Sequence, residues 1–216
     1  MVTTTNGISP AAWINRVVSD ALTNSAPDPD AWCRSVACAM TAHGLTRAAV
    51  AAVDSDSSAS SSGTSLDSED PESAPLRAHV CADPVAAQDN VLFASAEYGS
   101  ELVSGEVRVI FSGEVGLLRS HVPLLASLLA EVYRHRVAEP EARRAAILAR
   151  LRPSQRPIVP LLTTGMSQRD ISRVLGKSPH TVHDHTKMIY RTLDVHSRVE
   201  LASKWHGFPI EQPSEA

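Results

Sequence analysis

Residues 178–193, SPHTVHDHTKMIYRTL, place three histidines and an aspartate within six positions. Imidazole and carboxylate groups at this density could bind a metal ion, carry out acid/base chemistry or contact another macromolecule. On a helix the three imidazoles diverge, because successive residues are about 100° apart. His185 turns back toward the apolar side and cannot share a metal ion with His180 and His183, which with Asp184 fall short of a closed ligand set. The sequence therefore predicts no metal site in this segment.

Catalysis is not indicated elsewhere in the sequence either. The remaining histidines are single and lack acidic neighbours at ligand spacing. Nucleophile elbows and phosphate-binding glycine loops are absent from the sequence. We therefore expect no enzyme activity, no catalytic residue and no cofactor, and we interpret the histidine-rich segment as a contact surface.

The local signals in this segment are those of a helix with one buried stripe. Ser178 is a favoured N-cap, and Pro179 stands at the first helical position, where its missing N–H costs nothing. Val182, Ile189 and Leu193 recur at steps of seven and four, which gives a narrow apolar stripe that needs a core.

The opposite side of the same helix is polar. His180, Asp184, Lys187 and Arg191 fall within about 60° of one another on a helical wheel, with His183 on their flank. This face is expected to be free for contact with a partner.

A shorter helix is expected just before it, in GMSQRDISRVLGK. Ser167 can cap this helix, and Gly176 can adopt the left-handed conformation that ends it. Ile171, Val174 and Leu175 are predicted to face inward. Because the break before the next helix is two residues long, the two helices must cross steeply, as in a helix-turn-helix.

Residues 151–205 resemble the LuxR-type (GerE-like) helix-turn-helix domain of bacterial transcription regulators. The resemblance is carried by LLTTGMSQRDISRVLGKSPHTV, which follows the family spacing without a gap, and by IYRTLDVHSRVEL. It implies a four-helix module whose third helix enters the major groove of double-stranded DNA. Carried over to this chain, the base-reading positions are His183 and Asp184, with Lys187 one turn later. The further DNA-contacting residues expected are Arg169, Lys177, Ser178, His180, Thr181 and Arg191.

Two departures from the family pattern have structural consequences. Arg152 stands at the usual cap of the first helix, and Pro157 and Pro160 follow it. A proline inside a helix removes a backbone hydrogen bond, so the first helix should start late, capped by Ser154, or be kinked. In the reading helix, Asp184 would repel phosphate but could accept a hydrogen bond from a cytosine amino group, so the base preference should be unusual.

The last helix of the module is expected within VHSRVELASKW. Ser197 and Glu200 form a capping box at its start. The resemblance implies that this helix pairs two modules on DNA, as a homodimer on an imperfect inverted repeat. The predicted dimer interface consists of Val199, Leu201, Ala202 and Trp205.

Charge is distributed unevenly along the chain. Residues 151–205 carry nine Lys or Arg and four Asp or Glu, a net charge of +5, although the whole chain has a net charge of −4. A basic module attached to an acidic body is typical of DNA contact.

The N-terminal part predicts an α+β domain. Helices are expected at 9–22 and 28–44, strands at 46–53, 76–82, 90–98 and 105–111, and an amphipathic helix at 123–137 with Leu125, Leu128, Leu129 and Val132 inward. Residues 54–75 hold nine serines and six acids and are interpreted as a flexible loop. The element order weakly resembles GAF or PAS sensor domains. A phosphoacceptor receiver domain is disfavoured, because this sequence has no acidic pair at the end of an early strand. An autoinducer-binding domain is also disfavoured, because its pocket would need more aromatic residues than the nine in the chain.

The expected organisation is an α+β domain at 1–138, a linker helix at 139–150, the all-α four-helix module at 151–206 and a tail at 207–216. The chain is interpreted as a transcription regulator, with control by the N-terminal domain as one expectation. The sequence identifies neither a signal nor a small-molecule ligand for that domain. RNA polymerase is a further expected partner. Without a signal segment or an apolar run of about 18 residues, we expect a cytoplasmic protein that makes no membrane contact. Two other interpretations stay open: a sigma-factor-like promoter-recognition protein and an interaction adaptor that does not bind DNA.

Overall fold

The computed structural model describes residues 9–24, 28–43, 45, 47–55, 60–64, 91–112 and 118–208. The chain divides into two compact units, Met1–Glu139 and Pro140–Ala216. Within the described ranges, no helix combines the length and the apolar composition that crossing a membrane would require.

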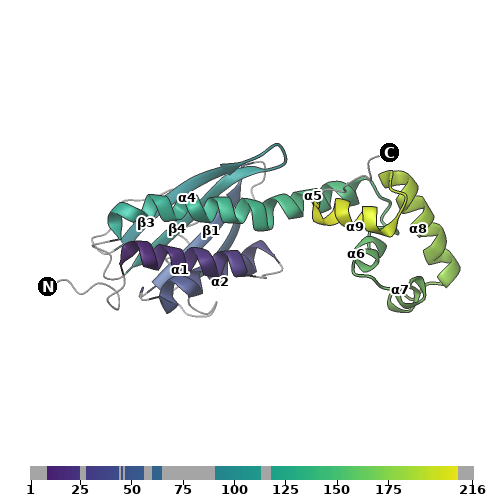
Figure 1. Ribbon diagram of the computed structural model, residues 1–216, viewed down its shortest axis with the longest axis horizontal. Helices are drawn as coiled ribbons and strands as arrows, with labels where there is room; N and C mark the ends of the chain where they lie inside the picture. Colours follow the sequence, from purple (N-terminus) through teal and green to yellow (C-terminus); the bar gives the residue numbers. More distant parts are fainter. Residues whose placement is uncertain are drawn as a thin grey trace, which may run out of the picture. The chain divides into compact units, whose positions relative to one another are not determined.

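The N-terminal unit is an α+β layer, as the sequence predicted. Its main elements are α1 (Pro10–Thr23), α2 (Pro29–Ala42), β1 (Arg47–Asp54), β2 (Ser60–Thr64), β3 (Val91–Gly99), β4 (Ser104–Ser112), a 3-10 turn (Arg119–His121) and α4 (Val122–Tyr133). The four strands form one antiparallel sheet in the order β2-β1-β4-β3 (Figure 1).

Both N-terminal helices begin where the sequence places their caps. The Ser9 hydroxyl accepts a hydrogen bond from the Ala12 N–H at 3.3 Å, and the Asp28 carboxylate accepts one from the Ala31 N–H at 2.7 Å. A proline follows each cap residue at the first helical position, where it preorganises the backbone. Local sequence alone therefore determines the start of α1 and of α2.

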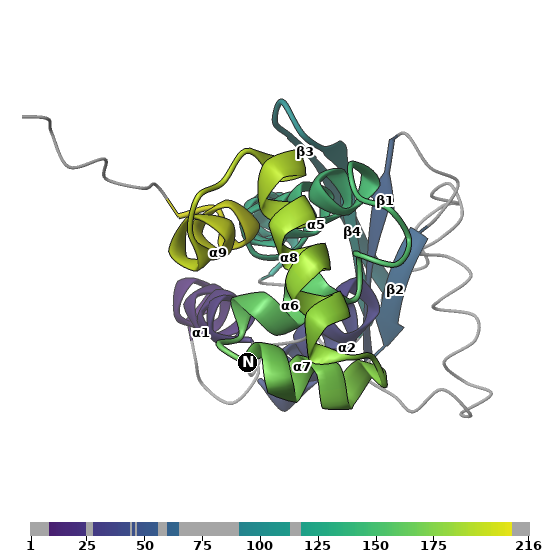
Figure 2. The ribbon, with the colours of Figure 1, turned by 90° about the vertical axis from the view of Figure 1, so that its right-hand side faces the viewer.

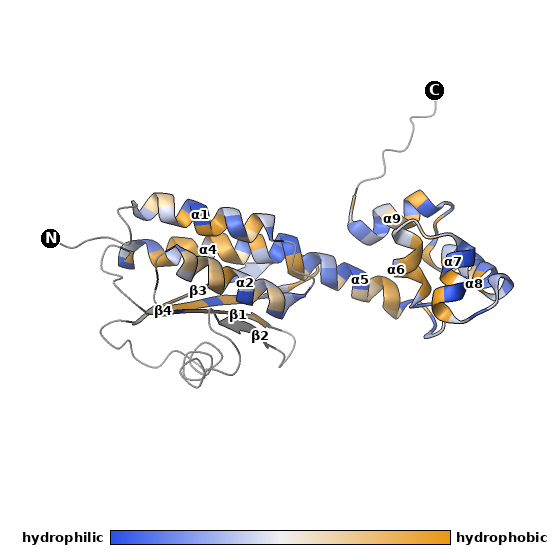
Figure 3. Ribbon diagram, turned by 90° about the horizontal axis from the view of Figure 1, so that it is seen from below, coloured by the Kyte–Doolittle hydropathy of each residue, from blue (hydrophilic) through white to orange (hydrophobic). Residues whose placement is uncertain are grey.

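The core of this unit lies between the helices and one face of the sheet. Figure 3 shows α1, α2 and α4 on the same side of the strands. Side chains alternate along β1, so Val50 points into this core, whereas Ala51 belongs to a small apolar cluster on the opposite face. Trp32 and Tyr133 meet edge to face with ring centroids 5.1 Å apart, which joins α2 to α4.

Two sequence expectations for this unit need correction. Residues 60–64, inside the segment interpreted as a loop, form strand β2, which pairs with β1 in antiparallel register. Backbone hydrogen bonding to β1 outweighs the low strand preference of serine and glycine there. Leu128 is 37 % exposed and not inward, although Leu125, Leu129 and Val132 are buried as predicted. The strand expected at 76–82 lies outside the described residues.

Helix α4 continues into a π-helical turn, η3 (Arg134–Ala138), and then α5 (Glu139–Ala149). The Glu139 N–H donates to the Arg134 carbonyl oxygen, five residues earlier. The Arg134 guanidinium also bonds the carboxylates of Glu131 and Glu139. Burial alone would raise the pKa of Glu139, but the hydrogen bond and the charge of Arg134 outweigh it and hold that pKa below its ordinary value. Helix α5 covers Glu139–Ala149, and the linker helix was predicted at 139–150. Its role as a linker stays a prediction.

Gly105 in β4 offers a direct test of this packing. A Cβ at this position would clash with the Val53 carbonyl oxygen and the Tyr98 side chain. The backbone of β1 cannot move away from it without disturbing the pairing of the strands. We predict that Gly105→Ala lowers the free energy of unfolding by about 1–3 kcal/mol, the usual cost of overpacking. Denaturant unfolding of the variant and the wild type measures this difference.

Gly99→Ala is the matched control, because a Cβ at Gly99 has no heavy atom within 4 Å. Equal stability losses in the two variants would contradict the packing around Gly105.

Candidate nucleic-acid interface

The C-terminal unit is all-α and consists of α5 together with four further helices. These are α6 (Ile158–Thr163), α7 (Gln168–Leu175), α8 (Pro179–Leu193) and α9 (Arg198–His206). They surround one apolar core, whose fully buried side chains include Ile158, Val159, Ile171, Val182, Ile189, Leu193 and Leu201. Figure 2 shows α6, α7, α8 and α9 around this core.

The segment from α7 to α8 is a helix-turn-helix. The Ser167 hydroxyl accepts a hydrogen bond from the Asp170 N–H at 3.2 Å, which caps α7. Gly176 ends α7 in the left-handed conformation at φ 61°, as its position predicted. The Ser178 hydroxyl then caps α8 by accepting from the Thr181 N–H at 3.0 Å. These caps confine the turn to a few residues, and α7 and α8 lie next to each other (Figure 2).

Helix α8 has one buried and one open side. Val182, Ile189 and Leu193 are fully buried, as predicted from their spacing. Thr186 completes the stripe, because its hydroxyl donates to the Val182 carbonyl oxygen at 2.8 Å and leaves the methyl group for the core. His185 beside the stripe is half-buried.

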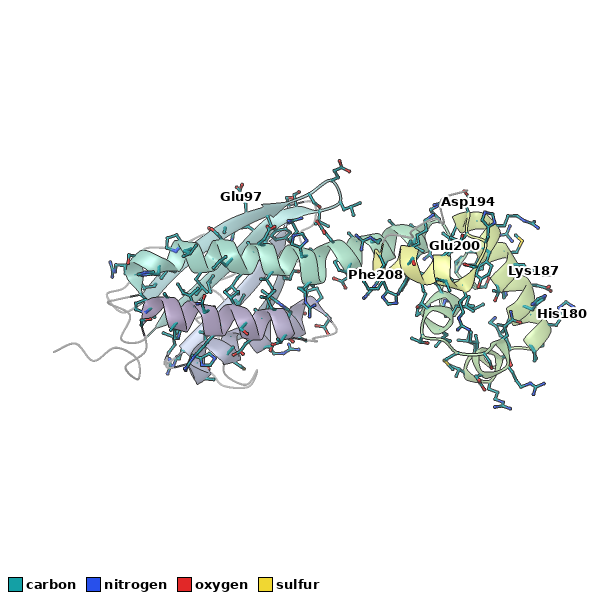
Figure 4. All side chains as sticks on the ribbon, in the orientation of Figure 1. Glu97, His180, Lys187, Asp194, Glu200 and Phe208 are labelled. Carbon is teal, nitrogen blue, oxygen red and sulfur yellow. The ribbon has the colours of Figure 1, made fainter. Side chains whose placement is uncertain are left out.

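The residues predicted to contact DNA lie on the open side of α8 and next to it. Figure 4 shows His180 and Lys187 pointing outward from α8. The exposed members on α8 are His180, Thr181, His183, Asp184, Lys187 and Arg191. The remaining predicted residues are the exposed cap Ser178, exposed Arg169 on α7 and half-buried Lys177 in the turn.

Two side-chain contacts organise the polar face of α8. His180 Nδ1 lies 2.9 Å from Asp184 Oδ2, one helical turn away, and both side chains are largely exposed. His183 Nδ1 lies 3.2 Å from the Gln168 Oε1 of α7. Sequence spacing alone could have indicated the first contact, since residues four apart on a helix are neighbours. The second joins two helices and could not have been found that way.

The start of α6 differs from the expectation. The N-cap is Pro157, without a side-chain hydrogen bond, and not Ser154. A late start was predicted correctly, and Pro160 falls in the first helical turn, where backbone N–H groups have no intrahelical acceptor. The preceding turn is held by Gln155, which is buried and accepts from the Arg152 N–H at 3.0 Å. The prolines are therefore accommodated without a broken helical hydrogen bond.

Hydrogen bonds from the Arg198 side chain to backbone carbonyl oxygens connect α9 to α6 and to the loop before α7. The Arg198 guanidinium donates to the carbonyl oxygens of Leu162 and Met166, each at 2.7 Å. The capping box is present: the Ser197 hydroxyl accepts from the Glu200 N–H at 3.1 Å. The hydrogen bond from the His196 N–H holds the pKa of the Glu200 carboxyl below its ordinary value.

The four residues of the predicted dimer interface differ in burial. Leu201 is 0 % and Trp205 7 % exposed, so both pack in the core of this unit. Trp205 also lies beneath the Arg144 guanidinium, 5.9 Å from it. Val199 is 73 % exposed and Ala202 half-buried. On α7 the expected inward residue Val174 is likewise 60 % exposed.

Comparison with known proteins decides what this unit is. The family described as bacterial regulatory proteins of the LuxR family matches residues 150–205. These residues form a LuxR-type helix-turn-helix domain. Similar proteins include Rv0890c of Mycobacterium tuberculosis strain H37Rv and Mb0914c of Mycobacterium bovis, both named provisionally as HTH-type transcriptional regulators. Each is 39% identical over 54 residues, which are 25% of this chain and 6% of the relative.

The LuxR-type domain is the part of the chain that these relatives share. The chain spans a small part of the length of the relatives that it matches, so the likeness is confined to this domain. The N-terminal unit lies outside the matched residues.

The Arg198 contacts generate a stability prediction for the LuxR-type domain. A lysine cannot reproduce two N–H groups aimed at two carbonyl oxygens. Because hydrogen bonds to charged groups contribute about 1.5–3 kcal/mol each, we expect Arg198→Lys to lower the free energy of unfolding of this domain by about 2 kcal/mol.

Arg173→Lys is the control, since the Arg173 side chain is 72% exposed and pairs with Asp170 at the surface. Denaturant unfolding followed by circular dichroism compares the two variants. Equal effects would mean that the carbonyl contacts of Arg198 do not stabilise the domain.

Proposed function

We propose that the chain regulates transcription by placing the open face of α8 in the major groove of double-stranded DNA. The main support is that α8, within a LuxR-type domain, has one buried apolar face and one exposed polar face. Its buried stripe fixes the helix on the core, while His180, His183, Asp184, Lys187 and Arg191 remain exposed. A helix held along one side can enter a groove about 12 Å wide with its other side.

The charges next to this face suit contact with phosphate groups. Lys187 and Arg191 are exposed on α8, and Arg169 is exposed on α7. Asp184 is the exception, but its pairing with His180 offsets its repulsion of phosphate whenever the imidazole is protonated. We assign Lys187, Arg191, Arg169 and Lys177 to the DNA backbone and His183 and Asp184 to the bases.

Two observations support DNA binding over an adaptor that does not bind DNA. Pro157, Pro160 and Asp184, the departures from the family pattern, are the residues that favour such an adaptor. Pro160 lies in the first turn of α6 without breaking a hydrogen bond, and Asp184 has a partner. The DNA-binding function is therefore the better supported of the two.

We further propose that the chain binds DNA as a homodimer and that the N-terminal unit controls this binding. The exposed apolar side chain of Val199, with Ala202 beside it, is the part of the predicted interface that remains available. A two-fold pair of modules would place two α8 helices in half-sites about one DNA turn apart.

Replacement of Lys187 tests the proposed contact with DNA. We predict that Lys187→Ala weakens binding and lowers the slope of log affinity against log salt by about one, because one phosphate contact is lost. Titrations by fluorescence anisotropy at several salt concentrations measure both quantities.

Arg16→Ala is the matched control, since it removes the same charge from an exposed position on α1. If the two variants show the same salt dependence, α8 does not carry the phosphate contact. If the wild type does not bind DNA at any of these salt concentrations, the adaptor is favoured.

Val199→Glu tests the homodimer. Val199 is 73 % exposed in the first turn of α9, where an acidic residue suits the helix dipole, so the fold should be unaffected. We expect the variant to bind a single half-site as the wild type does but to lose cooperative binding to an inverted repeat.

Val174→Glu on α7 introduces the same change at another exposed valine of the domain and should keep cooperativity. Sedimentation of the complexes counts the bound chains. Cooperative two-chain binding by Val199→Glu would exclude Val199 from the interface.

A further inference from the structure

The polar face of α8 presents hydrogen-bond acceptors at its two base-reading positions. Asp184 is 58% exposed in its side chain and can only accept when ionised. One carboxylate oxygen, Oδ2, lies 2.9 Å from His180 Nδ1, and the other, Oδ1, can accept from a further donor. The His180 ring lies one turn toward the N-terminus and so orients the carboxylate along the helix.

His183 becomes an acceptor through its contact with α7. Its Nδ1 lies 3.2 Å from the Gln168 Oε1, and a carbonyl oxygen can only accept. A neutral imidazole with its proton on Nδ1 donates to this oxygen. The other nitrogen, Nε2, then carries a lone pair and accepts hydrogen bonds.

We infer that His183 and Asp184 form an acceptor pair that selects bases with an amino group in the major groove. Two bases present such a donor there, cytosine at N4 and adenine at N6, whereas guanine and thymine present acceptors. Gln168 is the positioning residue, because it determines which nitrogen of His183 faces the base. The inference rests on the proposed function, and it specifies adjacent cytosine or adenine bases in each half-site.

Selection from randomised duplexes with the full chain identifies the bound half-site. We expect cytosine or adenine at two adjacent positions. A methyl group on N4 of that cytosine, or on N6 of that adenine, should then weaken binding about tenfold, because it occupies the groove side of the donor. A 7-deazapurine in the same base pair removes an acceptor and should leave the affinity unchanged.

Variants of Gln168 test its positioning role through the ratio of affinities for cytosine-containing and guanine-containing sites. Gln168→Glu keeps an acceptor beside Nδ1 and, measured at a pH at which the imidazole is neutral, should keep this ratio. Gln168→Lys offers donors only, so Nε2 should carry the proton and the ratio should shift about tenfold toward guanine. A uniform change of affinity cancels in the ratio, and thermal unfolding confirms that each variant is folded.

The outcomes separate the inference from the proposed function. If the wild type selects no sequence and binds no duplex, the proposed function fails. Specific binding to a half-site that tolerates the methylated amino groups leaves the proposed function intact and overturns the acceptor pair. An equal base ratio in Gln168→Glu and Gln168→Lys overturns the role of Gln168.

Discussion

The C-terminal unit depends on the burial of one side of α8. Val182, Ile189 and Leu193 are completely withdrawn from water, and each such side chain contributes about 1.5–3 kcal/mol when it leaves water. This stripe fixes the rotation of α8 about its own axis. A change of register would bury charged groups of the polar face, which is costly, and expose the stripe. The contact surface is therefore a consequence of the core, and its residues can vary without loss of the fold.

Caps and carbonyl contacts then fix the helices around this core. Ser167, Ser178 and Ser197 each satisfy a backbone N–H at the start of a helix. Arg198 does the same for carbonyl groups at the end of α6 and in the loop before α7. Short helices such as α6 and α7 would not form in isolation, because their hydrogen bonds do not offset the cost of nucleation. They exist in this domain because their ends are satisfied and their apolar sides are shared.

Signals within one element were predicted well from the sequence, and contacts between elements were not. The caps of α7, α8 and α9 and the stripe of α8 follow from spacing and side-chain chemistry. The sequence did not separate the buried Leu201 from the exposed Val199 on α9, because both are apolar and only the position of the other helices decides which is buried. The same holds for Val174. The contact between Gln168 and His183 joins residues fifteen positions apart, so no local pattern could reveal it.

The composition of strand β2 disfavours aggregation of the N-terminal unit through the edge of its sheet. It lies at one edge of the sheet, next to β1, and its five residues are SSSGT. An exposed edge offers unpaired backbone groups to any extended chain, which is how sheets aggregate. A short strand of serine, glycine and threonine has little apolar surface with which to recruit another strand. As the shortest of the described strands and an edge strand, β2 is expected to exchange its amide hydrogens fastest, so the sheet can open at this edge while β1, β4 and β3 remain paired.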